Sequence, residues 1–220
     1  MCFSAGASFV LAAALVPAGI ATLAKARRSA PGLLPFAVYP LAFGVQQAFE
    51  GVVWLGHTGG DATLTAIAAR GFLFFSHFFW LAWVPFSVWL TEPQPARRRI
   101  AGYISVVGLL YGLSIFLPSF LLADWLRVEV VERSLDYKTT LIYQDVISRT
   151  ALKLFYAALV VGALVLSSDR RIQIFGGLVA VSLALTYAFF AYAFISVWCF
   201  FAAILSLYLS VIVWRDGRRV

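Results

Sequence analysis

Long apolar runs separated by short polar breaks constrain this chain more than any other feature. Several runs are close to twenty residues long, and only 12 % of the 220 residues are charged. About twenty consecutive apolar residues are what an α-helix needs to cross the hydrocarbon core of a bilayer. The runs are continuous rather than alternating, which favours helices over a β-barrel. The sequence therefore predicts an all-α integral membrane protein with a single domain over residues 1–220.

A bundle of seven transmembrane helices accounts for the apolar runs. The helices are expected over residues 4–24, 33–55, 64–90, 100–122, 149–166, 172–190 and 195–214. Ser4 is the expected N-cap of the first helix, and Gly108 and Gly112 give the fourth helix a small-residue face suited to close packing. Residues 127–143, between the fourth and fifth helices, are predicted to form a short extracytoplasmic β-hairpin with its turn at 134–137.

The basic residues fall mainly on one side of this seven-helix arrangement. That side holds Lys25, Arg27, Arg28, Arg97, Arg98, Arg99, Arg170, Arg171, Arg215, Arg218 and Arg219. Because cytoplasmic loops carry the Lys/Arg excess, we expect the N-terminus outside and the C-terminus in the cytoplasm of a bacterial inner membrane. The net charge of +7 then reflects loop clusters, so the predicted partner is the lipid bilayer and not a nucleic acid.

Polar side chains inside the predicted helices mark the candidate site. A carboxylate in hydrocarbon costs several kcal/mol, so Glu50 of the second helix is a functional candidate by default. The predicted topology places it in the same outer half as Arg70 and His77, which lie seven residues apart on one face of the third helix. We predict an outward-facing pocket for a small ligand or ion there, lined by Gln46, Gln47, Glu50, Arg70, His77 and Lys153.

The two cysteines add a metal hypothesis and its alternative. Cys2 is expected at the outer mouth, and Cys199 about one turn into the seventh helix from the same side. Thiolates, an imidazole and a carboxylate can bind zinc or copper, so Cys2, Glu50, His77 and Cys199 form a candidate metal site. In an oxidising compartment Cys2 and Cys199 would instead form a disulfide. Glu50 also has a structural interpretation, as a buried ion pair with Arg70 or Lys153.

Three functions fit these features. The first is receptor-like or transport-related binding of a small ligand or metal ion in the outer pocket. The second is a membrane-embedded enzyme that uses a cysteine thiol or His77 on a lipid-like or quinone-like substrate. The third is an assembly subunit whose polar cluster only fixes helix packing. Because an isolated hairpin is marginal in water, we expect residues 127–143 to pack over the outer mouth and restrict access to Glu50.

Four stretches of the sequence resemble a family of uncharacterised bacterial multi-pass membrane proteins. They are Met1-Cys-Phe-Ser-Ala-x-Ala-Ser-Phe9, Gln46-Gln-x-x-Glu-Gly51, Phe75-Ser-His77 and Trp198-Cys-Phe-Phe201. The resemblance covers essentially the whole chain. It implies no activity, but it implies that these stretches are the family's shared pattern, which places Cys2, Glu50, His77 and Cys199 within it.

Overall fold

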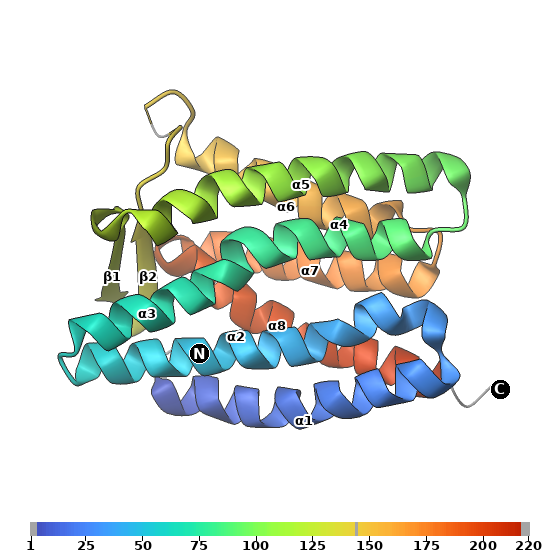
Figure 1. Cartoon of the computed structure of the whole chain (residues 1–220), viewed down its shortest axis with the longest axis horizontal. Coiled ribbons are helices and arrows are strands. Elements are labelled where there is room, and N and C mark those ends of the chain that lie inside the picture. The colour runs from blue at the N-terminus through green and yellow to red at the C-terminus, as the bar shows by residue number, and fades with distance from the viewer. Residues whose placement is uncertain (1–3, 144, 217–220) are drawn as a thin grey trace.

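A computed structural model describes residues 4–143 and 145–216, which form seven long helices and one β-hairpin (Figure 1). Six of the long helices are uninterrupted: α1 (Ala5–Ser29), α2 (Leu34–Thr58), α5 (Pro95–Leu121), α6 (Arg149–Leu166), α7 (Arg170–Phe189) and α8 (Phe194–Asp216). The remaining one joins α3 (Ala62–Leu73), a π-helical segment (Phe74–Phe79) and α4 (Trp80–Thr91). The predicted all-helical class with a small hairpin is confirmed.

Six of these long helices are long enough and apolar enough to cross a membrane, within the described part of the chain. The other one, α2, is 25 residues long, but Gln46, Gln47 and Glu50 interrupt its apolar sequence. It packs against α1, α3 and α8, and all three polar side chains are buried. Polar residues of a membrane helix normally face the interior of the bundle. The hydropathy of α2 can therefore be lower than that of the other long helices, because its neighbours bury its polar residues.

Two glycines of α5 allow the closest approach to the neighbouring long helix. A Cβ on Gly108 would lie 2.1 Å from the carbonyl oxygen of Leu81 in α4, and one on Gly112 would lie 3.1 Å from the carbonyl oxygen of His77. A larger side chain at Gly108 would force the backbones apart, and one at Gly112 would require a shift of a few tenths of an ångström. The predicted small-residue face of this helix is thus a real contact surface, and it packs on the π-helical segment as well as on α4.

The hairpin pairs strand β1 (Leu126–Val131) with strand β2 (Ser134–Thr139) in an antiparallel register that places Val131 opposite Ser134. Its turn is therefore Glu132–Arg133, with φ values of 45° and 65°, and the expected turn at 134–137 was wrong. Two-residue turns match the twist of a hairpin when both residues have positive φ, and Gly or Asn usually supplies this. Glu and Arg carry no such signal, so the turn was placed too late in the sequence.

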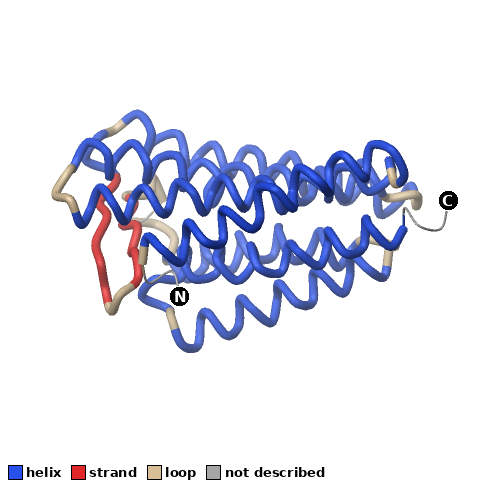
Figure 2. The backbone as a smooth tube through the Cα atoms, turned by 90° about the horizontal axis from the view of Figure 1, so that it is seen from below, coloured by secondary structure: helices blue, strands red, loops and turns tan. Residues whose placement is uncertain are grey.

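The hairpin lies across one end of the helices, here called the hairpin end (Figure 2). Leu135 and Tyr137 of β2 are buried. The ring of Tyr137 stacks on Phe72 of α3, with the ring centroids 4.6 Å apart and the planes within 8° of parallel. Leu135 and Tyr137 also belong to a hydrophobic cluster that includes Trp54 of α2. The expected packing of the hairpin over one end of the bundle is thus confirmed by contacts with α2 and α3, while restricted access to Glu50 stays a prediction.

The opposite end carries the basic connections. Figure 1 shows the α1–α2, α4–α5 and α6–α7 connections there, together with the end of α8. Glu92, just after α4, accepts hydrogen bonds from the backbone N and the Oγ of Ser168, at 2.7 and 2.5 Å. Burial acts to raise the pKa of Glu92, but the bonds from Ser168 and Gln94 and the nearby Arg97 outweigh it and hold the pKa below its ordinary value. The carboxylate of Glu92 thus joins the α4–α5 connection to the α6–α7 connection.

Candidate functional site

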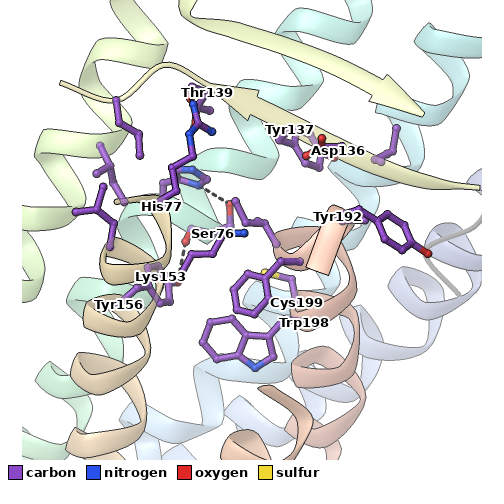
Figure 3. Close-up of a pocket in the computed structure, with 18 of the residues that line it drawn as sticks. Ser76, His77, Asp136, Tyr137, Thr139, Lys153, Tyr156, Tyr192, Trp198 and Cys199 are labelled. Carbon is purple, nitrogen blue, oxygen red and sulfur yellow. Dashed lines mark hydrogen bonds between the residues drawn. The ribbon is translucent and has the colours of Figure 1, made fainter. Parts of the chain in front are cut away.

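A cavity of about 130 Å³ lies beneath the hairpin, bounded by α5, α6, α8, the π-helical segment and β2 (Figure 3). We call it the hairpin cavity. Its charged or imidazole side chains are His77, Asp136, Arg149 and Lys153. One water molecule needs only roughly 10–15 Å³ of such a cavity. The hairpin cavity therefore has room for several waters or for a small organic ligand.

The π-helical segment places Ser76 and His77 on the cavity wall. The Oγ of Ser76 lies 3.0 Å from Nδ1 of His77, and both residues are buried. The hydroxyl of Tyr156 in α6 donates to the backbone oxygen of Ser76 at 2.7 Å. Single π-helical turns inside α-helices occur frequently at functional sites because they widen the helix locally. Here the widened turn is joined to α6 by a hydrogen bond to its backbone.

A second wall of the hairpin cavity is cationic and comes from α6. Arg149 and Lys153 lie one turn apart, after Ser148 begins the helix by capping the backbone N of Ala151. Arg149 donates from Nη2 to the backbone oxygen of Thr139 at 3.0 Å, which joins α6 to the hairpin. Lys153 Nζ lies 5.0 Å from the ring centroid of Phe194 in α8. A lysine over an aromatic face is held by the ring's electrostatic field.

Asp136 supplies the carboxylate of the cavity, from strand β2. Burial raises its pKa above the ordinary value of 3.8, against the lowering effects of Lys138, Lys153 and Arg149. The carboxylate therefore interacts with both cavity cations. With Asp136 ionised, two cations face one carboxylate, and the hairpin cavity has an excess of positive charge.

The polar stripe of α2 forms a separate, fully buried network. Glu50 accepts hydrogen bonds from Ser196 Oγ in α8 at 2.5 Å and from Gln47 Nε2 at 3.1 Å. Gln46 accepts from Trp80 Nε1 in α4 at 2.7 Å. All three side chains of the stripe are 0 % exposed. The network connects α2 to α4 and α8, so it contributes to helix packing whatever else it does.

The structure divides the six predicted pocket residues into two groups. His77 and Lys153 line the hairpin cavity, whereas Gln46, Gln47, Glu50 and Arg70 are not among the described residues that line it. Gln46 and Glu50 are nevertheless adjacent to it, because both interact with Cys199, which does line the cavity. The expected shared face of Arg70 and His77 assumed a regular α-helix, and the π-helical segment intervenes between these two residues.

The structure gives no support to the metal hypothesis. Within residues 4–143 and 145–216, no group of three or more His, Cys, Asp or Glu side chains is placed to hold a metal ion. Cys199 is buried and forms no disulfide with any described residue. Cys2 lies outside the described residues. The structure therefore does not describe the proposed coordination of zinc or copper by Cys2, Glu50, His77 and Cys199, or the alternative disulfide between Cys2 and Cys199. His57, at the end of α2, is exposed.

Several cavity residues were not included in the predicted pocket. Arg149, Lys153 and Tyr156 are spaced by four and three residues, which places them on one face of α6. That spacing was readable, although only Lys153 was selected. Trp198 directly precedes Cys199 in the sequence, so its place near the cavity could be predicted together with that of Cys199. Asp136 had no comparable signal, because its contribution depends on where the hairpin turn falls.

Comparison with known proteins gives a family and no activity. No curated protein matches the sequence. No solved structure matches the fold. The sequence profile of a family described as a family of unknown function (DUF6629) matches residues 1–220. This match spans all four stretches on which the resemblance rested, and the chain belongs to DUF6629.

Proposed function

We propose that this chain is a multi-pass membrane protein that binds a small anion in the hairpin cavity. All seven long helices would cross the membrane, with α2 shielded by its neighbours. The six apolar helices support this placement, as does the burial of the polar stripe on α2. The protein would act as a receptor or as part of a transport process, in both of which a ligand is held without being converted.

The proposed orientation puts the hairpin outside the cell. The connections at the opposite end carry most of the Lys and Arg residues, and such connections are normally cytoplasmic. The N-terminus would then be outside and the C-terminus in the cytoplasm of a bacterial inner membrane. The hairpin cavity would face the extracytoplasmic side.

The observation that carries the proposal is the pair of cations on α6 beneath a packed hairpin. Lys153 is half-buried and Arg149 is exposed. A partly buried cation interacts more strongly with an anion than a cation in water does, because the local dielectric is lower. Lys153 would pair with the anion, Arg149 would attract it at the mouth, and Ser76 with His77 would offer hydrogen bonds. This arrangement favours an anionic ligand over a neutral or cationic one.

Thermal unfolding of the protein in lipid nanodiscs tests the proposal. The probes are butyrate, succinate and inorganic phosphate, each titrated separately. An anion at about 100 times its Kd stabilises a protein by about 2.7 kcal/mol, which raises Tm by roughly 5–10 °C in a chain of this size. We expect such a rise for at least one probe, and its loss in Lys153→Met.

Lys138→Met is the matched control, since Lys138 is an exposed lysine of the hairpin that pairs with Glu129. It should retain the ligand-dependent rise in Tm. The proposal fails if none of the three anions stabilises the wild type, or if Lys153→Met and Lys138→Met respond alike. Labelling of single cysteines placed at residues 93 and 132 in intact cells tests the orientation, and only the second should react from outside.

A further inference from the structure

A second compartment lies deeper in the bundle, and its lining is almost entirely apolar. It measures about 40 Å³ and lies between α2, α4, α6, α7 and α8. Phe43, Val84, Val160, Phe175 and Ala202 are among the residues that line it. We call it the lower compartment. Nothing in the proposed binding of a small anion uses it.

Three side chains line both the hairpin cavity and the lower compartment: Tyr156, Trp198 and Cys199. The two spaces therefore share these residues as a common wall. Figure 3 shows Trp198 and Cys199 on the side of the hairpin cavity away from the hairpin strand. A ligand that occupied both spaces would have to pass these three residues.

We infer that the ligand is a single-chain anionic amphiphile. Its anionic group, a carboxylate or a phosphate, sits by Lys153, and its apolar chain passes Trp198 into the lower compartment. This inference rests on the proposed function and adds the ligand class to it. The charged end and the apolar end of the site match the two ends of such a molecule.

Trp198 is the side chain that moves to admit the chain. Tyr156 is held by its hydrogen bond to the backbone of Ser76. The indole N–H of Trp198, by contrast, is buried with no hydrogen-bond partner among the described residues. Its ring contacts Tyr156 and Phe194 at centroid distances of 5.6 Å in both cases. Rotation of the indole thus breaks no hydrogen bond to the described residues, and its cost is the packing that Trp198 makes in the hydrophobic core.

The size of the lower compartment sets the expected effect. At roughly 10–15 Å³ for each water-sized position, about 40 Å³ holds about three such groups. A methylene group is of similar size, and each one buried contributes about 0.8 kcal/mol. Three methylenes then strengthen binding by a factor on the order of 50. A four-carbon acid ends within the hairpin cavity, while an eight-carbon acid reaches the lower compartment.

Isothermal titration calorimetry on the protein in nanodiscs, with empty nanodiscs subtracted, tests this inference. The probes are butyrate, octanoate, octyl phosphate and octyltrimethylammonium. We expect octanoate and octyl phosphate to bind on the order of 50-fold more tightly than butyrate. Octyltrimethylammonium, with the same chain and a cationic head, should bind more weakly than butyrate.

Ala202→Leu fills the lower compartment and is the decisive variant. Ala202 lines only that compartment and not the hairpin cavity. The variant should reduce the advantage of octanoate to less than about fivefold and leave the affinity for butyrate unchanged. If the leucine variant does not fold, Ala202→Val, which adds less volume, is used in its place. Lys153→Met should weaken butyrate and octanoate by the same factor.

The outcomes separate the two proposals. If butyrate and octanoate bind equally and both depend on Lys153, the amphiphile inference is wrong and the proposed function stands. If octanoate keeps its full advantage in the Ala202 variants, its chain lies elsewhere and the inference is also wrong. If neither acid binds the wild type, both the inference and the proposed function are wrong.

Discussion

Tyr137→Ala is the sharpest test of the hairpin as a cover over the hairpin cavity. Tyr137 is only 4 % exposed, and its ring stacks on Phe72. Cys199, on the cavity wall, reports access from the hairpin side. The assay follows the reaction of Cys199 with a charged methanethiosulfonate reagent, in a Cys2→Ser background so that only one cysteine reacts.

The magnitude follows from what the truncation removes. Replacing a buried aromatic residue by alanine costs about 3–5 kcal/mol, of which the ring stack accounts for about 0.5–1.5 kcal/mol. If the hairpin opens and closes rapidly compared with labelling, the labelling rate scales with the population of the open form. A loss of about 3 kcal/mol in docking therefore speeds the reaction by a factor on the order of 100.

Lys138→Ala is the control on the same strand, because Lys138 is exposed and contacts Glu129 on the hairpin itself. Its labelling rate should stay within about twofold of the parent. An unchanged rate in Tyr137→Ala would refute the hairpin as a barrier to the cavity. An equal acceleration in both variants would instead refute the stack of Tyr137 on Phe72 as the contact that holds the hairpin down.

Three further predictions concern stability, measured by thermal unfolding in nanodiscs. Gly108→Ala forces a Cβ against the Leu81 carbonyl and should cost about 1–3 kcal/mol, whereas Gly162→Ala, which meets open space, should not destabilise; equal Tm values would contradict the tight packing. Ser196→Ala removes a donor to Glu50 and should cost about 1–3 kcal/mol, and Ser196→Thr should retain more of the stability than Ser196→Ala. Glu92→Gln should be less stable than the wild type at neutral pH. Because the pKa of Glu92 is depressed in the fold, the stability that its carboxylate contributes is full above the ordinary pKa of 4.5 and is lost as the pH falls below that value. The Tm curves of the two proteins should therefore converge in acid, and a constant difference in Tm would contradict the assignment.

The helices were predictable because their signal is local. An apolar run of membrane-spanning length is read from consecutive residues, and Ser4 caps a backbone N three residues away. The glycines of α5 are recognised because they lack a side chain. The polar stripe of α2 was also recognised, since a carboxylate in an apolar run has few interpretations. What the sequence did not show is whether Glu50 faces a cavity or a neighbouring helix. Ser196, its partner, is 146 positions away.

The hairpin cavity was harder to predict because it depends on geometry that has no simple sequence pattern. A π-helical turn has no reliable residue signature, so His77 was placed by α-helical spacing. The turn at Glu132–Arg133 lacks the usual glycine or asparagine, and moving it moves every residue of β2. Asp136 was therefore assigned to a turn when it lies on the cavity.

The π-helical segment also lets the chain hold one residue more than a regular α-helix would hold between its two halves. Because its hydrogen bonds run from i to i+5, removing one of its six residues would leave a regular α-helix with both halves in nearly the same phase, whereas each further residue removed would rotate one half by about 100°. Phe72, before the segment, is fixed under the hairpin by its stack on Tyr137. Trp80, after it, is fixed to Gln46 by a hydrogen bond. These two anchors thus fix the phase of the two halves of the helix, and the π-helical segment takes up the extra residue between them.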